Sequence, residues 1–313
     1  MFKSALFLGA LASRAVATTY NLADNFVGPS FLTGFNWEAI ADPTHGNVNY
    51  VSQATAISQN LTYTSSDTLI LRADYKSTTN FPTTAGRNSV RIRSNKLYTT
   101  AVTVLNLRHM PVGCGTWPAF WTVLESDWPN SGEVDIIEGV NDVSPNHSTL
   151  HTSPGCTMAA NTMTQTGTLV TTDCNTAVNG NAGCGVATTK ANSYGPGLNA
   201  AGGGYYATER TATSIKIWFW ARNEANIPAD ILAGGSSVNP ANWGTPTADF
   251  VNNSCAFSHF GGHNIIINLT FCGDWAGAVY PSTCPSTCNN YVNTNPAAFQ
   301  NAYWNIASLK VYE

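Results

Sequence analysis

Charged side chains are scarce in this sequence. Only 10% of its 313 residues are Asp, Glu, Lys or Arg, and the formal net charge is −4. Without a basic surface the chain lacks the electrostatic attraction that nucleic acids and anionic membranes require, so we exclude both as partners. Asn, Thr, Ser and Gly carry the polar content instead, and aromatic residues make up 11%. This composition suits an uncharged, hydroxyl-rich ligand such as a sugar polymer, but equally a solvated surface over a large core.

The N-terminal hydrophobic run is too short to cross a bilayer, because it covers only residues 5–12. It follows Lys3 and precedes the small residues Ala15-Val16-Ala17. This order predicts a signal peptide over residues 1–17, with the mature chain starting near Thr18. The sequence ends in SLKVYE, without the hydrophobic tail of a lipid-anchor signal. We therefore expect a secreted, extracellular protein that is not bound to a membrane.

Several motifs of common enzyme classes are missing. There is no Gly-x-Ser-x-Gly elbow, and the glycine-rich segments 202–204 and 261–262 lack the spacing of a phosphate-binding loop. His259 and His263 are four residues apart, but a predicted strand follows directly, so they do not form a helical zinc pair. We expect neither a cofactor nor a catalytic metal.

The cysteines fit an exported protein. All eight lie beyond residue 17, at positions 114, 156, 174, 184, 255, 272, 284 and 288. An even count predicts up to four disulfides, and proximity favours bridges within the cysteine-rich loop and near the C-terminus. Zinc is the weaker interpretation, because the Cys284-x-x-x-Cys288 pair has no second pair of similar spacing. Glycosylation sequons predict glycans on Asn60, Asn146 and Asn252, while the sequon at Asn268 falls within a predicted strand.

The sequence pattern indicates strands and very little helix. Segments rich in Val, Ile, Thr and aromatic residues predict strands at 68–76, 89–94, 98–109, 117–125, 132–140, 146–152, 204–211, 214–222, 263–271 and 303–312. We expect one short helix over 297–302 after a proline, and a long loop over 154–203 pinned by disulfides. Many strands without intervening helices predict an all-β jelly-roll sandwich of two antiparallel sheets. No linker is visible, so residues 18–313 should form a single domain.

Three carboxylates share one predicted strand in the segment Ser131–Gly139 (SGEVDIIEG). Glu133 and Asp135 are two residues apart and therefore point to the same face. Glu138 would point to the opposite face of a regular strand. One extra residue at position 136 or 137, extruded as a β-bulge, returns Glu138 to the face of the other two acids. The spacing therefore predicts a bulge and a row of three acids.

Such a row is costly unless it is used, because neighbouring carboxylates raise one another's pKa. Retaining glycoside hydrolysis uses this situation: one ionised carboxylate attacks the sugar while a protonated one donates to the leaving oxygen, about 5–5.5 Å away. The alternatives are the charged edge of a strand, which the aliphatic neighbours make improbable, and a calcium site. Asp135, between the two glutamates, is placed to share a proton with the nucleophile and to tune both partners.

The segment EVDIIE resembles the active-site signature of glycoside hydrolase family 16 in its bulge-containing form. Flanking blocks strengthen the resemblance to fungal laminarinase-type members: GTWPAFW from Gly115, Trp128-Pro-Asn, Gly139-Val-Asn, HTSPGC from His151 and FCGDWAG from Phe271. The similarity extends from about Tyr20 to the C-terminus. It implies a β-jelly-roll with a substrate cleft on its concave sheet. By position in the signature, it also implies Glu133 as nucleophile, Asp135 as its helper and Glu138 as general acid/base.

Aromatic residues near the acids are candidates for the walls of such a cleft. Pyranose rings present apolar faces that stack on indole, and the family resemblance implies that Trp117, Trp121, Trp128 and Trp275 line the sugar subsites. Core packing is the alternative for Trp117 and Trp121, and it is the preferred interpretation for Trp218 and Trp220. His151 falls where similar proteins place a histidine near the acids. Arg91 is either a sugar ligand or the partner of an acid.

We therefore expect an endo-acting β-glucanase that cleaves β-1,3-glucan, with mixed β-1,3/1,4-glucan as a second substrate. The expected partner is β-glucan, and we expect a monomer. Transglycosylation is the first alternative, because a covalent glycosyl-enzyme can pass its sugar to another sugar instead of water. A non-catalytic glucan-binding protein is the second, and the three intact acids count against it.

Overall fold

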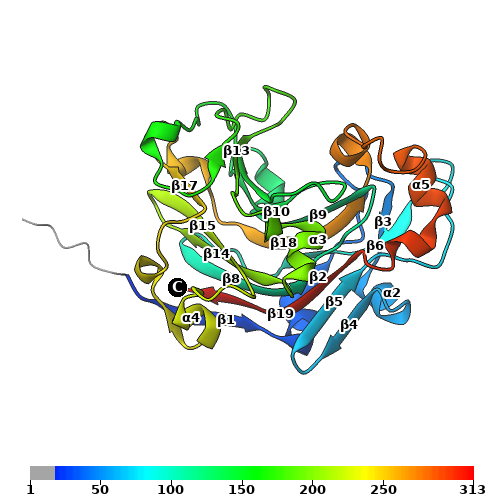
Figure 1. Cartoon of the computed structure of the whole chain (residues 1–313), viewed down its shortest axis with the longest axis horizontal. Coiled ribbons are helices and arrows are strands. Elements are labelled where there is room, and N and C mark those ends of the chain that lie inside the picture. The colour runs from blue at the N-terminus through cyan, green and yellow to red at the C-terminus, as the bar shows by residue number, and fades with distance from the viewer. Residues whose placement is uncertain (1–17) are drawn as a thin grey trace, which may run out of the picture.

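The protein is a sandwich of two large antiparallel sheets, and the computed structural model describes residues 18–313 (Figure 1). The expected signal peptide, residues 1–17, lies outside the described residues. The nine-stranded sheet runs β16 (Ser237–Val238), β1 (Tyr20–Phe26), β19 (Tyr303–Tyr312), β8 (Ala101–His109), β14 (Gly204–Arg210), β15 (Ser214–Ala221) and β17 (Ala248–Val251), with β5 (Thr68–Arg72) beside β19 and β4 (Thr62–Ser65) beside β5. This architecture confirms the predicted all-β fold class.

The eight-stranded sheet carries the three acids. Its order is β12 (Thr168–Leu169), β13 (Cys184–Ala187), β11 (His147–His151), β10 (Glu133–Glu138), β9 (Thr116–Val123), β18 (Asn264–Phe271), β7 (Arg91–Ser94) and β2 (Phe35–Trp37). A short parallel pair, β3 (Val48–Tyr50) and β6 (Arg87–Ser89), forms a third sheet. Loops rise on both sides of β10, β9 and β18, near β13 on one side and near α5 on the other (Figure 1).

The main core lies between the two sheets. On β19 the inward-facing residues Trp304, Ile306, Leu309 and Val311 are fully buried, and an irregularity in the pairing after Ile306 shifts the alternation by one residue. From the opposite sheet, Val134, Ile136 and Ile137 of β10 join the same core. The aliphatic residues between the acids thus anchor β10, and the acids are left to the outer face of its sheet. Burying these aliphatic side chains contributes roughly 1.5–3 kcal/mol each.

Helices are short and few. They are α1 (Phe31–Gly34), α2 (Gln53–Ser58), α3 (Gly195–Ala200), α4 (Ala229–Ala233) and α5 (Cys288–Thr294). The helix predicted over 297–302 was wrong in kind, because the structure forms only a 3₁₀ turn at Pro296–Phe299 there. The predicted loop 154–203 was partly wrong, since it contains β12, β13 and α3. Strand β13 adds to the edge of the acidic sheet through β11, so this segment extends the sheet instead of only covering it.

All eight cysteines form disulfides, as predicted from their even count. Cys174–Cys184 lies within the segment 154–203, and Cys272–Cys288 lies near the C-terminus. Proximity along the chain anticipated these two. Cys114–Cys284 and Cys156–Cys255 span 170 and 99 residues, a separation that sequence proximity does not indicate. Two disulfides therefore join loops that come from distant parts of the chain.

Candidate active site

The β-bulge predicted between the acids is present in β10. Against β9, Asp135 pairs with Trp121 and Ile137 pairs with Phe120, so Ile136 is the extra residue. The pairing with β11 shifts at the same place, between Asp135 and Glu138. Glu133 and Glu138 are both half-buried, whereas the aliphatic residues between them are buried in the core. The bulge accordingly allows Glu138 to share the outer face with Glu133 and Asp135.

Two buried polar residues of the neighbouring segment fix the bulge. The side-chain amide of Asn146 donates to the carbonyl oxygen of Ile136 at 2.9 Å, and its oxygen accepts from the Glu138 backbone amide at 3.1 Å. The Ser148 hydroxyl donates to the same Ile136 carbonyl at 3.0 Å. These contacts satisfy the backbone groups that the bulge removes from regular pairing. Asn146 and Ser148 therefore hold Glu138 in place.

This arrangement corrects the prediction of a glycan on Asn146. The Asn146 side chain is only 3% exposed, and its nitrogen, to which a glycan would be attached, is hydrogen-bonded inside the sheet. A glycan there is incompatible with the folded bulge. The predicted sites Asn60 and Asn252 are exposed, and they stay predictions. Asn268, set aside at the sequence level, is buried and bonded on both ends of its amide.

Each terminal acid accepts a hydrogen bond from a tryptophan. The Trp128 indole nitrogen donates to Glu133 Oε2 at 2.5 Å, and the Trp117 indole nitrogen donates to Glu138 Oε1 at 2.9 Å. Trp128 is 43% exposed and Trp117 is half-buried. Of the predicted subsite tryptophans, these two therefore touch the acids directly. Their indole rings remain partly open to solvent, as a sugar platform requires.

The local turn before Glu133 depends on glycine. Gly132 has φ +71°, and a Cβ atom there would lie 2.5 Å from the Phe260 ring and 2.7 Å from the His259 carbonyl oxygen. A side chain at this position would meet both a steric clash and a strained backbone. Gly132 thus allows the chain to enter β10 with Glu133 placed beside Trp128.

His151 and Asp135 form the inner part of the acidic row. His151 Nε2 lies 3.3 Å from Asp135 Oδ2, and its Nδ1 lies 2.9 Å from Asn181 Oδ1 in the segment 154–203. Burial alone would lower the pKa of His151, but the hydrogen bond and charge of Asp135, with Glu133 and Glu138, raise it to about 10. The acids around His151 thus favour its protonated form. Sequence analysis placed His151 here, whereas nothing in the sequence pointed to Asn181.

Burial sets the protonation of the acids. It raises the pKa of Asp135 well above its usual range, and the nearby Glu133 and Glu138 charges act in the same direction. Burial also raises the pKa of Glu138, although the hydrogen bond from Trp117 opposes the increase. A carboxyl group with a raised pKa can keep its proton at mildly acidic pH and donate it. Glu138 therefore has the environment of a general acid.

The acidic row could also offer ligands to a cation. Glu133, Asp135 and His151 each place one potential ligand atom within 4.8 Å of the others. A metal would have to displace the proton from His151, whose pKa is raised, before that ring could coordinate it. The donor set thus fits a proton-sharing cluster better than a metal site, and no step described below requires a metal.

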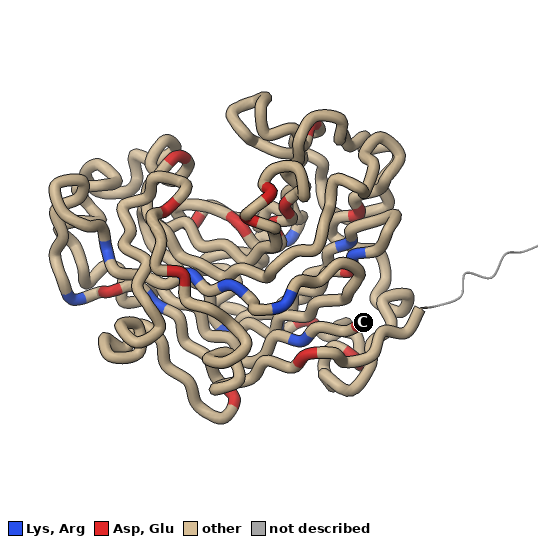
Figure 2. Tube along the Cα trace, turned by 180° about the vertical axis from the view of Figure 1, so that it is seen from behind, with Lys and Arg blue, Asp and Glu red and all other residues tan. Residues whose placement is uncertain are grey.

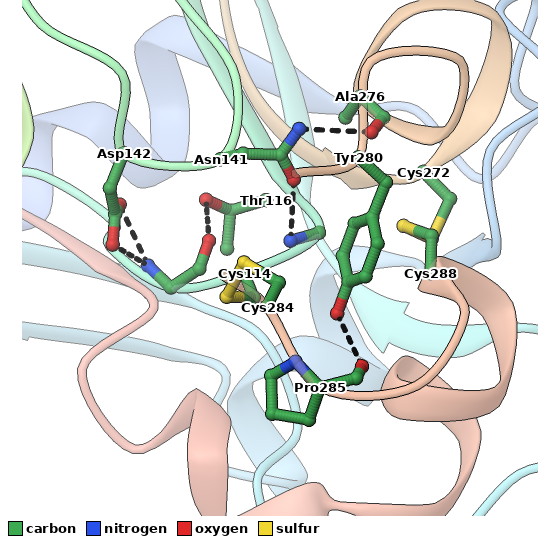
Figure 3. Close-up of a disulfide and its surroundings, with 12 residues drawn as sticks. Cys114, Thr116, Asn141, Asp142, Cys272, Ala276, Tyr280, Cys284, Pro285 and Cys288 are labelled. Carbon is green, nitrogen blue, oxygen red and sulfur yellow. Dashed lines mark hydrogen bonds between the residues drawn. A yellow bond between two sulfur atoms is a disulfide. The ribbon is translucent and has the colours of Figure 1, made fainter. Parts of the chain in front are cut away.

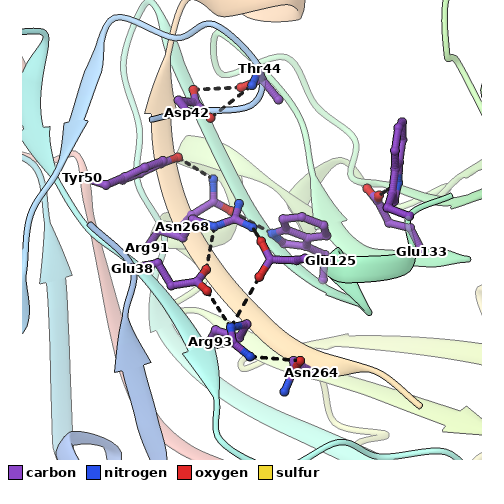
Figure 4. A network of polar contacts seen from close by, with 12 residues as sticks. Glu38, Asp42, Thr44, Tyr50, Arg91, Arg93, Glu125, Glu133, Asn264 and Asn268 are labelled. Atoms are coloured by element: carbon purple, nitrogen blue, oxygen red, sulfur yellow. Dashed lines mark hydrogen bonds and ion pairs between the residues drawn. The ribbon is translucent and has the colours of Figure 1, made fainter. Parts of the chain in front are cut away.

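Arg91 is buried and paired with two acids. It is 3% exposed, its Nε donates to Glu38 Oε2 at 2.9 Å, and its Nη2 donates to Glu125. Arg93 Nε also donates to Glu38, at 2.6 Å (Figure 4). The Arg91 guanidinium lies 5.0 Å from the centre of the Trp121 ring. Of the two sequence interpretations, the structure supports the arginine paired with acids, and places it against Trp121.

Trp121 is held by a second polar chain. Its indole nitrogen donates to Asn268 Oδ1 at 2.8 Å, and the Asn268 amide donates to the Tyr50 hydroxyl at 3.1 Å (Figure 4). Glu125 belongs to the 3₁₀ turn Glu125–Asp127, directly before Trp128. The charged cluster of Arg91, Glu38 and Glu125 therefore links the surroundings of Trp121 to the turn that carries Trp128.

Trp275 lies on a turn beside Trp117. The two ring centres are 5.6 Å apart in an edge-to-face arrangement, and Trp275 belongs to the π-helical turn Gly273–Gly277. The disulfides Cys272–Cys288 and Cys114–Cys284 flank this turn and the start of β9 (Figure 3). The structure thus brings Trp117, Trp128, Trp275 and His151 around the acids. Trp218 and Trp220 instead pack edge to face against Trp243 in a second hydrophobic cluster, as predicted.

Acidic residues gather between the two groups of rising loops, and basic residues lie mostly below them (Figure 2). Within this acidic region, Glu133 and Glu138 flank Asp135 on one strand. The two glutamates each accept a hydrogen bond from a tryptophan. One can act as a nucleophile while the other, with its raised pKa, supplies a proton. This is the arrangement of a two-carboxylate glycosidase.

No helix within residues 18–313 is both long and apolar enough to cross a membrane.

Comparisons with known proteins agree with this geometry. A family model described as the XgeA-like catalytic GH16 domain matches residues 35–312. A probable endo-1,3(4)-β-glucanase of Aspergillus fumigatus is 45% identical over 307 residues, covering 94% of this chain and 46% of that protein. The chain therefore spans about half the length of this curated relative.

Two solved structures share the architecture. Laminarinase 16A of Phanerochaete chrysosporium, a GH16 enzyme solved with β-glucans in its donor and acceptor sites, is 60% identical with a TM-score of 0.93, covering 95% of this chain and 100% of that one. An elongating GH family 16 β-1,3-glucosyltransferase is 38% identical with a TM-score of 0.87, covering 94% and 100%. The chain belongs to glycoside hydrolase family 16, among its XgeA-like catalytic domains.

Proposed function

We propose that this chain is a secreted endo-β-glucanase that hydrolyses β-1,3-glucan with retention of anomeric configuration, acts also on mixed β-1,3/1,4-glucan, and works as a monomer. The observation that carries this proposal is the bulged strand, which gives Glu133, Asp135 and Glu138 a common face. The similarity to an endo-1,3(4)-β-glucanase and to laminarinase 16A supports the choice of β-1,3-linked substrate.

The reaction proceeds in two displacements. In the first, the Glu133 carboxylate attacks the anomeric carbon, the glycosidic bond breaks, and the Glu138 proton passes to the leaving oxygen. In the second, Glu138 takes a proton from water, which displaces Glu133 and releases the sugar with its original configuration. Retention requires the two carboxyl groups to lie about 5–5.5 Å apart, too close for water between them in the first step.

The residues around the acids have supporting roles in this mechanism. The Trp128 indole holds Glu133 in one orientation, while Asp135 and His151 share protons in the interior of the row. Exposed parts of the Trp117, Trp121, Trp128 and Trp275 rings provide apolar platforms for glucose faces. The half-buried setting of the acids strengthens every charge interaction with the reacting sugar.

Reducing-sugar release by the purified mature protein at mildly acidic pH tests the proposal. The panel contains laminarin, mixed-linkage cereal glucan, xyloglucan, cellulose and agarose, and chromatography gives product sizes. We expect short oligosaccharides from laminarin, fewer from the cereal glucan, and none from cellulose or agarose. Proton NMR of the first products should show the β-anomer. A first-formed α-anomer would contradict the retaining mechanism, and inactivity on laminarin would contradict the substrate.

Transglycosylation is the second candidate, and the similarity to an elongating β-1,3-glucosyltransferase favours it. A sugar hydroxyl then replaces water in the second displacement and receives the glycosyl group from Glu133. Incubation with laminari-oligosaccharides at high concentration distinguishes the two functions. Products longer than the starting sugar identify transfer, and shorter products alone identify hydrolysis.

A further inference from the structure

Asn141 follows Glu138 by three residues and connects three parts of the site (Figure 3). Its backbone amide donates to the Thr116 carbonyl at 3.0 Å, and its side-chain oxygen accepts from the Gly115 amide at 2.8 Å. Its side-chain nitrogen donates to the Ala276 carbonyl at 2.9 Å. Both the oxygen and the nitrogen of the side-chain amide are thus hydrogen-bonded, and the residue is only 6% exposed.

The backbone conformation at this position also favours Asn. Asn141 has φ +54°, in the left-handed region that Asn and Asp enter more readily than other residues with a side chain. It therefore reaches the loops on both sides from a turn that most residues would strain.

Other bonds also hold these loops: the Asp142 carboxylate accepts from the Gly113 amide at 2.8 Å, and further contacts join the two loops to each other. Cys114–Cys284 and Cys272–Cys288 flank the two loops, and the Cys272 amide donates to the Gly115 carbonyl at 2.8 Å. Within residues 18–313, the Asn141 side chain makes the one hydrogen bond between the segment 139–142 and the turn Gly273–Gly277. The disulfides hold the two loops together, and both Asp142 and Asn141 bond the first loop to the segment after Glu138. Of the two, Asn141 also reaches the turn that carries Trp275.

Ala276 is the neighbour of Trp275, whose ring packs on Trp117, and Trp117 donates to Glu138. We propose that Asn141 is a positioning residue, whose side-chain amide sets the place of Trp275 relative to Glu138 and so the strength of glucan binding. This inference rests on the proposed function. Asn141 acts through Trp275 and needs no contact with substrate itself.

Asn141→Asp removes the hydrogen bond to the Ala276 carbonyl and keeps the one from the Gly115 amide. Asp tolerates the left-handed backbone and keeps the oxygen that accepts from Gly115, but it places a second oxygen against the Ala276 carbonyl. Loss of this hydrogen bond should raise KM for laminarihexaose about threefold to tenfold while kcat changes less than twofold. Gln165→Glu is the matched control: Gln165 also bridges a backbone amide (Asp249) and a carbonyl (Gly167), and it contacts none of the predicted site residues.

A double-mutant cycle with Trp275→Ala separates positioning from general destabilisation. If Asn141 acts through Trp275, Asn141→Asp should raise KM in the wild-type background and leave it unchanged once Trp275 is replaced. Equal effects in both backgrounds, or no effect in either, would overturn the proposal. Should the Asp variant not fold, Asn141→Gly, which keeps the backbone conformation and its bond to Thr116, enters the same cycle.

The cycle also keeps this inference apart from the proposed function. If the wild type does not hydrolyse laminarihexaose, the function is wrong, and the same cycle is read from the Kd of laminarihexaose by calorimetry. If the wild type is active and the two substitutions are additive, only the positioning role fails.

Discussion

At the scale of single residues, Glu133 and Glu138 are chemically alike but differ in surroundings. Glu133 accepts a hydrogen bond from the exposed Trp128, whereas burial raises the pKa of Glu138. The same side-chain type can therefore serve as an ionised nucleophile at one end of the row and as a proton donor at the other.

Replacing Glu133 by Gln should lower kcat by more than about a thousandfold, because the amide cannot form the covalent intermediate. Glucan binding should persist, since the shape of the site is kept. Reducing-sugar release measures the loss of kcat, and calorimetry with laminarihexaose measures glucan binding. Glu209→Gln, on β14 in the other sheet, is the matched control and should retain full activity. Near-normal hydrolysis by Glu133→Gln would refute the assignment of the nucleophile.

Trp117→Phe should move the basic limb of the kcat/KM pH profile to higher pH. The Trp117 hydrogen bond stabilises the ionised Glu138 and so lowers its pKa, in opposition to burial. Without that bond the pKa of Glu138 rises further, and the general acid keeps its proton at higher pH. Trp121→Phe is the control, because its indole donates to Asn268 and not to a predicted catalytic acid. A basic limb that does not move in Trp117→Phe would contradict Glu138 as the acid.

At the scale of elements, the decisive feature is the bulge at Ile136. The spacing of Glu133, Asp135 and Glu138 was sufficient to predict it, because a strand alternates its faces strictly. The groups that hold it were not predicted. Asn146 and Ser148 belong to a glycosylation sequon, which predicted an exposed position for Asn146. Both side chains are instead buried and donate to the Ile136 carbonyl.

Asn146→Ala should destabilise the fold by about 1–3 kcal/mol, because two backbone groups of the bulge lose a partner. It should also lower kcat, since Glu138 is no longer held in place. Ser148→Ala should cost less, because Asn146 still donates to Ile136. Urea unfolding and laminarin hydrolysis measure the two effects. If both variants had the kcat of the wild type, these contacts to the bulge would not matter for catalysis.

The surroundings of Arg91 show why the rest of the site could not be derived from sequence. Its partners Glu38 and Glu125 lie 53 and 34 residues away, and no local pattern links them. The same holds for Asn181 beside His151 and for Asn141 beside Ala276. Periodicity identified ten strands and the acids on one of them, whereas contacts between loops depend on how the whole chain folds.

At the scale of the whole molecule, buried histidines link stability to pH. Burial lowers the pKa of His263 to about 3, and its Nε2 lies 2.6 Å from the Ser131 carbonyl oxygen next to the acidic strand. The unfolded chain binds a proton near pH 6.5, whereas the folded one resists it. Stability is therefore lost as pH falls from about 6.5 towards 3, by up to about 1.4 kcal/mol per pH unit.

His263→Gln should remove this part of the pH dependence, because Gln can donate to Ser131 but does not titrate. The measurement is the free energy of unfolding in urea at several pH values between 3 and 7, on the wild type and the variant. The difference between them isolates His263 from the acids of the row. Two parallel stability curves would show that His263 is not the group responsible.

The two long-range disulfides have a consequence for cleavage of the chain. A protease that cuts any one bond between Cys156 and Cys255 produces an N-terminal piece with Glu133 and Glu138 and a C-terminal piece with Trp275. Cys114–Cys284 and Cys156–Cys255 each have one cysteine in either piece. The nicked molecule therefore remains covalently connected, with its acids and Trp275 in one particle, and it separates into fragments only after reduction.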